Sequence, residues 1–467
     1  MAHLVVIGGG AAGLSAAYHA RQAAPDLQIT LLEAENRLGG KILTVAEQGF
    51  VLEGGPDAVV RYKPWALELM CELGLEAEIV STTPARPAAL IHSGGRALPI
   101  PAGLQMVVPG DLRALAQSPL LSPLGKARAL LDLFIPKRPQ GDEAFGAFIE
   151  RRLGRQVWER LVAPLTGGIY GGDPYELSTQ AAFPQLVALE QQHGSLIRGA
   201  IAQRKARGNR EAGQLFASLE GGLGRLVQAL EARLIAVDIR LGTQVRGIER
   251  SKGWLIHTSA EWIQADAIVL ATPAGVSGEL LANLHPEAAR ALKAIPYSSS
   301  TTVSLAFDKA QLPPRVGHGI LMSLGQGFST RGFTWSDQKW TGRAPEGFGL
   351  VRAYFSGVEA SPDELVKLAL HDLERLWGRV PKPLQSWVFH WPLGLPRYTV
   401  GHQERLAQAL SAETLPGLFL AGAAYHGVGL PEVIRMGRST AQRAIAFLLS
   451  KSLESEPEDL QKPRAQA

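Results

Sequence analysis

The chain has 467 residues, 46% of them hydrophobic, which is ample for folded domains and too long for one simple core. Its formal net charge is +4, and no dense Lys/Arg tract is present, so the composition argues against nucleic-acid binding. Cys71 is the only cysteine, which excludes an intramolecular disulfide and a cysteine-based metal site. The helical pattern around it predicts a buried thiol. Because there is no membrane-length apolar run and no basic signal-peptide start, we expect a cytoplasmic protein.

The first forty residues predict a phosphate-binding turn. Residues 4–7 form an apolar run of strand length, and residues 14–20 have helical composition. Between them lie Gly8, Gly9, Gly10, Ala11, Ala12 and Gly13, in the pattern G-x-G-x-x-G. A strand, a glycine turn and a helix in this order leave bare backbone and free N–H groups for a pyrophosphate.

An acidic residue strengthens this prediction. A second apolar run, 29–32, ends in Glu33, about 20 residues after the last glycine, where a carboxylate accepts hydrogen bonds from an adenosine ribose. Glycine-rich turns alone also occur for purely structural reasons. Both strands, the helix and the acid together predict a dinucleotide site.

Two further glycine turns follow. Arg37 precedes a pair of glycines at 39–40, and the apolar run 50–53 leads into another glycine pair at 54–55. Glycine turns of this kind let the backbone approach a ligand closely, although both could also be ordinary structural turns.

Residues 100–210 have a different character. Leu, Ala and Arg recur at helical spacing over 112–133 and 145–165, with prolines as breaks. The segment 120–131 has an apolar face flanked by cations, which suits either a membrane surface or a packed helix bundle. The glycine-rich stretch 164–174 predicts a loop that lines a site.

The C-terminal half alternates predicted strands and helices. Strands are expected at 244–249, 254–258, 297–307 and 348–355, and the apolar run 267–273 predicts a buried parallel strand. Residues 418–422, 423–430 and 431–449 repeat the order of strand, glycine loop and helix. The polar residues 451–467 predict a disordered tail.

Several motifs together resemble a known family. They are 168–173 with 177–178, 53–56, 221–223, 396–402 and 427–431. In this order they resemble the FAD-dependent oxidases that include monoamine oxidases, phytoene desaturases and protoporphyrinogen oxidases. The likeness to the porphyrinogen oxidase branch runs from about residue 4 to residue 449.

The resemblance implies one non-covalent FAD. The expected pyrophosphate contacts are the glycine turn 8–13, and Glu33 is expected at the ribose. The other residues implied near the cofactor are Ala34, Lys41, Gly55, Pro56, Asp57, Ala58, Val245, Trp391, Val428, Gly429 and Leu430. The resemblance names no catalytic acid or base, because the flavin carries the reaction and the protein supplies orientation and electrostatics. No metal is expected.

The resemblance also implies a tetrapyrrole pocket. Gly168 and Ile169 are expected to face the substrate, with Ile320 and Phe333 as apolar walls, although both could equally be core residues. Arg86 is the candidate for a propionate. Arg61 and Lys63 stay as alternatives, because the carboxylate-binding arginine of the family does not align cleanly.

The expected fold class is α/β, in the broad sense that includes α+β. A split, Rossmann-like FAD-binding domain is expected over 1–75, 215–290 and 388–450. A sheet-based substrate domain is expected over 76–100 and 291–387, and a helical, membrane-associating insertion over 101–214.

The expected activity is oxidation of coproporphyrinogen III or protoporphyrinogen IX by O2, with release of H2O2, late in heme biosynthesis. Arg61, Lys63, Arg86 and Arg96 favour the more acidic coproporphyrinogen. A flavin amine oxidase, a carotenoid-type desaturase and a non-enzymatic binding protein are the alternatives. Peripheral contact with the inner face of the membrane, a homodimer and hand-over to a ferrochelatase are left open.

Overall fold

The computed structural model describes residues 2–138, 141–170, 173–207 and 215–454, which form two compact units. Unit 1 comprises Met1–Gly40, Val227–Ala294 and Leu406–Ala467, and unit 2 comprises Lys41–Leu226 and Ile295–Arg405. Both units combine strands and helices, so the predicted α/β class, in the broad sense that includes α+β, is confirmed. The finer division into three domains stays a prediction. Most of the expected tail lies outside the described residues.

Unit 1 is built on a parallel sheet. Within the described residues its strand order is β12-β2-β1-β16-β22, and every neighbouring pair is parallel. The strands are β1 (His3–Ile7), β2 (Gln28–Leu32), β12 (Asp238–Arg240), β16 (Ala267–Leu270) and β22 (Leu418–Leu420). Three separate stretches of the chain therefore meet in one sheet. Continuous apolar runs suit its central strands, because both faces of such a sheet are covered.

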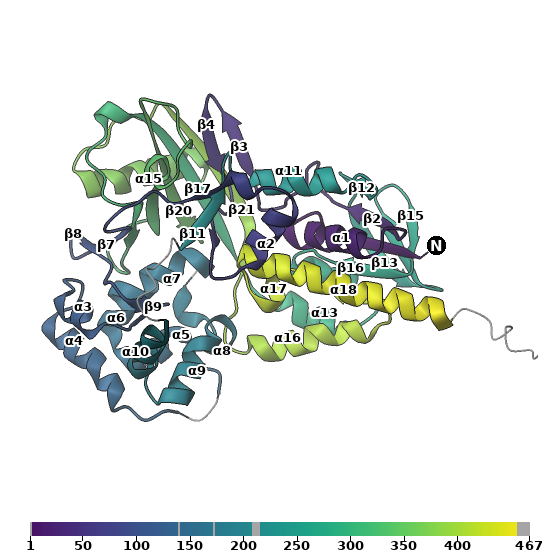
Figure 1. The fold of residues 1–467 in the computed structure, drawn as a ribbon, viewed down its shortest axis with the longest axis horizontal. Coiled ribbons are helices and arrows are strands. Elements are labelled where there is room, and N and C mark those ends of the chain that lie inside the picture. Colours follow the sequence, from purple (N-terminus) through teal and green to yellow (C-terminus); the bar gives the residue numbers. More distant parts are fainter. Residues whose placement is uncertain (1, 139–140, 171–172, 208–214, 455–467) are drawn as a thin grey trace, which may run out of the picture. The chain divides into compact units, whose positions relative to one another are not determined.

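Two helices cover one face of the parallel sheet. Helix α1 (Ala11–Ala23) and helix α18 (Leu430–Glu454) lie side by side (Figure 1). The Ser15 hydroxyl donates to the Ile434 carbonyl at 2.8 Å. A methyl group at Gly437 would lie only 2.3 Å from the Ala12 carbonyl oxygen, so the two backbones approach closely.

Smaller elements complete unit 1. An antiparallel sheet contains β13 (Val245–Arg250), β14 (Trp254–Thr258) and β15 (Trp262–Ala265), and β15 contacts β1. The helices are α11 (Gly224–Arg233), which starts in unit 2, α12 (Ala274–Leu280), α13 (Pro286–Lys293), α16 (His402–Leu410) and α17 (Ala423–His426).

Unit 2 is built on a larger sheet, called here the large sheet. In the described part of the chain its order is β21-β17-β20-β19-β18-β7-β8. The strands are β7 (Leu90–Ser93), β8 (Arg96–Pro99), β17 (Tyr297–Asp308), β18 (Gly319–Met322), β19 (Gly332–Trp335), β20 (Phe348–Ser356) and β21 (Gln385–Pro396). All pairings are antiparallel except that of β7 with β18.

The two faces of the large sheet differ. Helix α15 (Pro362–Trp377) packs on one face, called here the α15 face (Figure 1). Its core contains Val303, Val351, Ala353 and Leu373. The opposite face, called here the polar face, carries Thr302, Arg352 and Tyr354, because alternate residues of a strand point to opposite sides.

The predicted helical insertion is present in unit 2. It contains α3 (Leu112–Gln117), α4 (Pro123–Leu130), η2 (Leu131–Leu133), α5 (Phe145–Leu153), α6 (Arg155–Val157), the π-helical turn η3 (Trp158–Val162), α7 (Ala163–Tyr170), η4 (Pro174–Glu176), α8 (Thr179–Ala182), α9 (Pro184–His193) and α10 (Leu196–Arg207). None of the helices within the described residues combines the length and the apolar character needed to cross a bilayer.

A buried ion pair stabilises the helical insertion. Arg152 Nε lies 2.6 Å from Asp132 Oδ1, and both side chains are fully buried. The second Asp132 oxygen accepts hydrogen bonds from the Ser195 hydroxyl and the Ile197 N–H. The pair therefore joins η2, α5 and the start of α10.

Two expectations are corrected. The loop predicted over 164–174 is mostly helix, because α7 runs to Tyr170, while Gly171 and Gly172 lie outside the described residues. Cys71 is exposed, so the predicted buried thiol was wrong. It lies on α2 (Trp65–Glu72), whose buried positions Ala66, Leu69 and Met70 leave Cys71 off the packed face.

The remaining elements of unit 2 are short. They are β3 (Thr44–Glu47), β4 (Phe50–Glu53), β5 (Val59–Val60), η1 (Glu76–Glu78), β6 (Ile79–Ser81), β9 (Leu104–Gln105), β10 (Val108–Pro109), β11 (Phe216–Leu219), η5 (Lys309–Gln311) and α14 (Ser336–Lys339). Residues 411–414 form a further short helix, η6 (Ser411–Thr414), in unit 1.

Candidate functional site

The glycine turn of unit 1 has the geometry that its sequence predicts. Strand β1 ends at Ile7, α1 begins at Ala11, and Gly10 is the N-cap. A methyl group at Gly13 would lie 1.8 Å from the Gly8 carbonyl oxygen, so glycine is required where the helix meets the strand. A methyl group at Gly10 would meet nothing within 4 Å. The turn is therefore tightly packed on one side and open at Gly10, which fits a pyrophosphate.

Glu33 is fixed directly behind this turn. One carboxylate oxygen accepts the Gly9 N–H at 2.6 Å, and the other accepts the Glu35 N–H at 2.8 Å. The carboxylate is therefore oriented by backbone donors, with lone pairs left on both oxygens. A hydrogen bond from Glu33 to a ribose stays a prediction.

The second glycine loop of unit 1 leads into α18. Gly422 and Gly427, with φ of +136° and +127°, bracket the short helix α17. Val428 and Gly429 follow, and α18 begins at Leu430, so this loop ends at a helix N-terminus, where partial positive charge accumulates. Val245 lies at the start of β13, and Ala34 directly follows Glu33.

In unit 2 the loop after β4 lies on the polar face of the large sheet. The Trp391 indole donates to the Gly54 carbonyl at 2.8 Å, and the Thr302 hydroxyl donates to the same oxygen at 3.3 Å. Arg352 donates to the Gly55 carbonyl at 2.5 Å. The sheet therefore fixes the backbone of the turn 54–58, which the sequence predicts beside the flavin.

Charged side chains surround this turn. Asp57 lies 2.7 Å from Lys339 Nζ and accepts a hydrogen bond from the Trp340 indole. Burial alone would raise the pKa of Asp57, but Lys339 and Arg352 outweigh it and hold that pKa well below its usual range. Asp57 therefore remains ionised and anchors the end of the turn.

Glu53, directly before the turn, is a structural acid. Its carboxylate accepts the Leu223 N–H at 2.7 Å and the Thr44 hydroxyl at 2.6 Å, with Arg343 at 3.5 Å. Burial raises the pKa of Glu53 in spite of these partners. The contact with Leu223 explains why the motifs 53–56 and 221–223 occur together.

Lys41 combines burial with a positive charge. Burial lowers the pKa of Lys41 to about 8. Its ammonium lies 5.7 Å from the centre of the Tyr297 ring, and no carboxylate among the described residues forms an ion pair with it. A buried cation of this kind fits an anionic ligand such as a flavin dinucleotide.

The register of the large sheet places two predicted substrate residues. Ile320 on β18 pairs with Phe333 on β19, and both side chains belong to the core under α15. Both residues therefore have the core position that the sequence allowed as the alternative to a pocket wall. Because a shift of one residue changes the face, Leu321 and Thr334 point to the polar face instead.

The polar face also carries residues that were not predicted. The Tyr354 hydroxyl donates to the Thr334 hydroxyl at 3.1 Å, and Arg352 lies over the Tyr354 ring at 5.0 Å. The alternation of residues 348–355 was the available signal, since it places Arg352 and Tyr354 on one face. Without the pairing partners, the sequence could not show which face the 54–58 turn covers.

The predicted cations are dispersed over unit 2. Arg61 follows β5 and donates to the Ser81 hydroxyl at 2.7 Å, whereas Arg86 is exposed in the loop after β6. Arg96 is exposed on β8, the edge strand of the large sheet. Lys63 lies near the Tyr62 ring. Gly168 and Ile169 belong to α7, so their expected contact with the substrate stays a prediction.

Comparison with known proteins identifies the family. The chain matches the family of flavin containing amine oxidoreductases over residues 11–445. It is 33% identical to the coproporphyrinogen III oxidase of Bacillus subtilis (strain 168), covering 96% of this chain and 99% of that protein. It is 31% identical to protoporphyrinogen oxidase 1, chloroplastic, of Arabidopsis thaliana, covering 95% and 88%.

A solved structure gives the same result. The fold is similar to that of a chain from Exiguobacterium sp. 255-15 assigned as a protoporphyrinogen oxidase. The TM-score is 0.84 at 36% identity, with 96% of this chain and 99% of that chain covered. The open backbone at Gly10 in unit 1 fits the flavin after which the matched family is named. The chain therefore belongs to the family of flavin-containing amine oxidoreductases.

Proposed function

We propose that this chain oxidises a porphyrinogen to the porphyrin with O2 as electron acceptor, and that coproporphyrinogen III is its better substrate. The observation that carries the proposed porphyrinogen oxidation is the similarity to the B. subtilis coproporphyrinogen III oxidase over nearly the full length of both chains, whereas the preference between substrates rests on charge. Such coverage includes the glycine turns, the large sheet and the helical insertion together. The reaction would be a late step of heme biosynthesis.

We propose one non-covalent FAD as the cofactor. The turn 8–13 would hold its pyrophosphate, Glu33 and Ala34 its adenosine ribose, and Val245 its adenine end. Lys41, the turn 55–58, Trp391 and the loop 428–430 would contact the rest of the cofactor. Bound FAD supplies a two-electron acceptor that O2 reoxidises with release of H2O2, so three rounds convert one porphyrinogen to one porphyrin.

The residues of the chain orient the reactants. Arg352, Thr302 and Trp391 hold the turn 54–58 on the polar face, and Lys41 offsets negative charge beside it. Next to that turn the polar face presents Tyr354 and Thr334, which suit a flat ligand with polar N–H groups. We place the tetrapyrrole against this part of the sheet.

Charge supports the choice of coproporphyrinogen. That substrate carries four propionates, whereas protoporphyrinogen carries two, and burial of an unpaired carboxylate is costly. Arg61, Lys63 and Arg86 are the cations predicted to pair with propionates. Arg61 is held by Ser81, while its Nε has no partner among the described residues. The relatives of known name include oxidases of both substrates, so identity alone does not separate them.

Side-by-side turnover tests the function. Purified protein would receive each porphyrinogen, while porphyrin fluorescence, O2 uptake and H2O2 are followed. We expect fluorescence from both, with the larger kcat/KM for coproporphyrinogen III and three O2 consumed per porphyrin. Oxidation of an aromatic amine with no porphyrin formed would favour the amine oxidase alternative. A colourless protein that lacks flavin would favour a binding protein.

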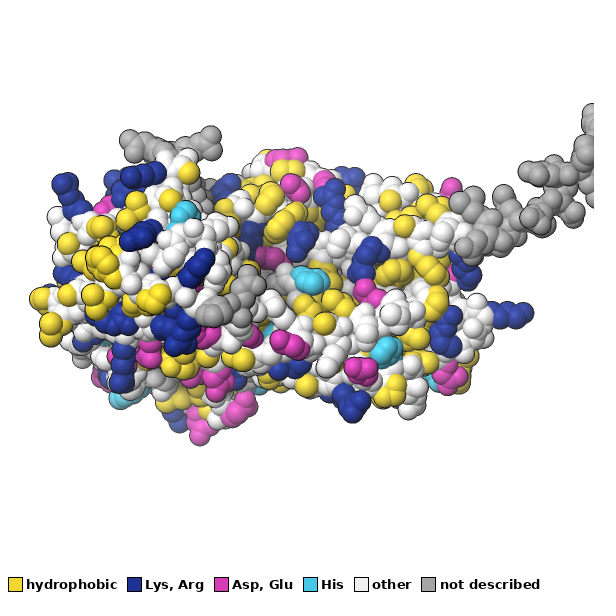
Figure 2. Space-filling view, turned by 90° about the horizontal axis from the view of Figure 1, so that it is seen from below, with side chains coloured by type: hydrophobic (Ala, Val, Ile, Leu, Met, Phe, Trp, Pro, Cys, Tyr) yellow, Lys and Arg dark blue, Asp and Glu magenta, His cyan; other side chains and the backbone are white. Residues whose placement is uncertain are grey.

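We also propose a peripheral contact between the helical insertion and an anionic membrane surface. Leu124, Leu131 and Phe134 are 83%, 52% and 79% exposed, and the cations Lys137 and Arg138 follow them. Apolar and cationic side chains lie together over the left end of the molecule in Figure 2. A flotation assay with anionic vesicles tests this contact. The protein should float with the vesicles, and the double variant Leu124→Ser/Phe134→Ser should not. A homodimer and hand-over to a ferrochelatase stay predictions.

A further inference from the structure

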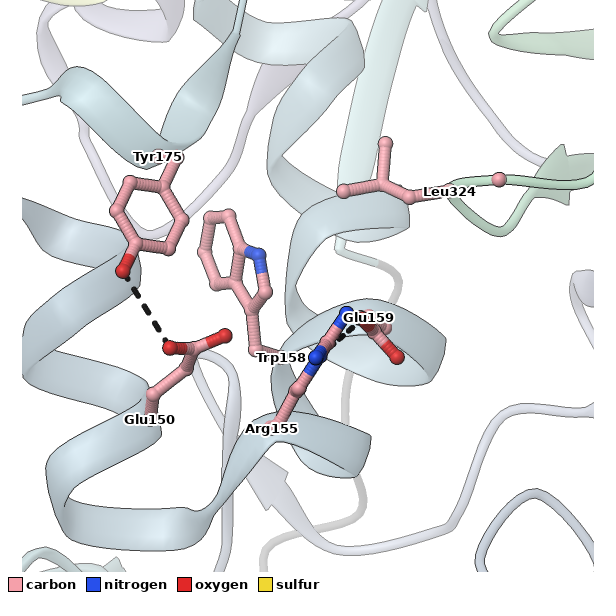
Figure 3. Close-up of a pocket in the computed structure, with 7 residues that line it drawn as sticks. Glu150, Arg155, Trp158, Glu159, Tyr175 and Leu324 are labelled. Carbon is pink, nitrogen blue, oxygen red and sulfur yellow. Dashed lines mark hydrogen bonds and ion pairs between the residues drawn. The ribbon is translucent and has the colours of Figure 1, made fainter.

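A cavity of about 570 Å³ opens on the helical insertion, within unit 2. It lies where α5, α6 and η3 meet the loop after β18 (Figure 3). The residues that line it are Glu150, Arg155, Trp158, Glu159, Tyr175, Leu324 and Gly325. None of them is among the residues assigned above to the flavin or to the tetrapyrrole. Its volume is within the range of small-molecule sites.

The cavity has an uncompensated negative charge. Arg155 Nε lies 2.6 Å from Glu159 Oε1, so these two charges offset each other. Glu150 forms no ion pair among the described residues, and its side chain accepts one hydrogen bond, from the Tyr175 hydroxyl at 3.3 Å. That distance is long for a hydroxyl bound to a carboxylate. Glu150 therefore retains lone pairs for a stronger donor.

Two aromatic rings stand beside this carboxylate. The Trp158 and Tyr175 rings meet edge to face, with centroids 5.5 Å apart, and both lie next to Glu150 in Figure 3. The Tyr175 ring is seated against Gly146, where a methyl group would lie only 1.9 Å from its Cδ2. The Asp173 carboxylate accepts the Tyr175 N–H and caps η4. The aromatic wall is therefore preformed.

The backbone beneath Glu150 is fixed as well. Gly154, with φ of +91°, ends α5 and donates to the Glu150 carbonyl at 3.0 Å. The Arg128 guanidinium donates to the same carbonyl at 2.9 Å. The position of the carboxylate therefore does not depend on a flexible loop.

The charge of the cavity does not suit a porphyrinogen. A substrate with propionate groups would bring further carboxylates toward Glu150, which is unfavourable. A positively charged ligand would instead gain from the carboxylate and from the ring of Tyr175, which is partly exposed, whereas Trp158 is buried in the core. Leu324 adds an apolar wall.

We propose that this cavity is a binding site for a small organic cation with an apolar body, such as a substituted ammonium. The cationic group pairs with Glu150 and contacts the Tyr175 ring, which the buried Trp158 supports from behind, while the apolar body lies toward Leu324. The site is independent of the proposed oxidase reaction, because it shares no residue with it.

Titration calorimetry on the full-length, flavin-loaded protein tests the proposal. The probe is benzyltrimethylammonium, with benzyl alcohol and benzoate as the neutral and anionic comparisons. We expect saturable binding of the cation alone, and about a tenfold loss of affinity in Glu150→Gln, as for a desolvated cation that loses its partner. The matched control is Glu374→Gln, which removes an exposed acid of α15 that is not among the residues lining the cavity and should bind as the parent does.

Further measurements separate the alternatives. Tyr175→Phe keeps the ring and should retain binding, whereas Tyr175→Leu should weaken it, with unchanged thermal midpoints showing that each variant is folded. Equal affinity for the cation and benzyl alcohol would overturn the proposal, as would equal losses in Glu150→Gln and Glu374→Gln. Displacement of the cation by coproporphyrin III would also overturn it, because the cavity would then belong to the tetrapyrrole site.

Discussion

The Trp391 indole donates a hydrogen bond to the Gly54 carbonyl at 2.8 Å. Strand β21 therefore holds a turn that lies more than three hundred residues earlier in the chain. Loss of this bond in Trp391→Phe should cost about 1 kcal/mol and weaken FAD binding severalfold, because the turn 54–58 becomes less ordered. Titration of the flavin-free protein with FAD measures the effect.

Trp387 on the same strand is the matched control. Its indole N–H is buried and has no hydrogen-bond partner within the described residues, so Trp387→Phe removes an indole without removing a bond. FAD affinity should stay at the parent value in this variant. A loss as large as that in Trp391→Phe would show that the effect comes from packing.

The phosphate turn separates binding from folding. Gly10→Val adds a side chain where the backbone is open, so the variant should fold with a near-parental thermal midpoint and emerge without flavin absorbance. Gly13→Ala places a methyl group 1.8 Å from the Gly8 oxygen and should lower the midpoint of the flavin-free protein as well. Retention of a full complement of FAD by Gly10→Val would refute the assignment of this turn.

Lys41 should give stability a specific pH dependence. The pKa of Lys41 is about 8 in the folded chain and 10.5 ordinarily, so between these values the unfolded chain binds more protons. The contribution of Lys41 therefore makes the folded chain more stable as the pH rises through this interval. Below the interval the ammonium stays charged in the folded chain, and the full cost of burying it lowers the stability. Lys41→Met should be the more stable protein near neutral pH, with the difference closing above pH 10.5.

The measurement for Lys41 is the difference in thermal midpoint between flavin-free parent and variant, followed across that interval. Other groups that titrate there cancel in the difference. A difference that does not change with pH would show that Lys41 is not buried in its charged form.

The buried ion pair of Arg152 and Asp132 should contribute more to the free energy of unfolding than a surface ion pair does. Arg152→Met leaves the Asp132 carboxylate buried without its cation and should cost about 3–5 kcal/mol in urea unfolding. Arg204→Met breaks a half-exposed pair with Asp111 and should change the urea midpoint little. Similar losses in both variants would argue against a special role for the buried pair.

The charge argument for the substrate has its own test. Arg86→Ala and Lys63→Ala should lower kcat/KM for coproporphyrinogen III more than for protoporphyrinogen IX, because the first has more propionates to pair. Arg198→Ala, on the exposed side of α10, serves as the control. An unchanged ratio of the two kcat/KM values would remove the charge argument, whichever substrate is preferred.

The sequence predicted the local pattern of unit 1 well. The order of strand, glycine turn and helix at 4–20 and 418–449 is determined by close contacts, such as that between Gly13 and Gly8, which leave few other residues acceptable. The glycines of 164–170 predicted a loop for the same reason, yet α7 is helical. Packing in the helical insertion there outweighs the low helix propensity of glycine.

The candidate substrate residues show a second limit. The resemblance implied Ile320 and Phe333 as apolar walls of the substrate pocket, but strand register decides the face on which they lie. Register depends on pairing with β7 and β20, which are far away in sequence. Glu53 illustrates the same point, since its partner Leu223 lies 170 residues later.

The order of strands in unit 1 has a consequence for biosynthesis. Strand β1 and the phosphate turn are synthesised well before β22, which pairs with β16, and before α18, which packs on α1. The five-stranded sheet can be completed only after residues 418–449 have left the ribosome, because β22 pairs with β16 and the Ser15 hydroxyl donates to the Ile434 carbonyl. A nascent chain that lacks residues 418–449 therefore has an unpaired edge at β16 and leaves α1 without its packing partner.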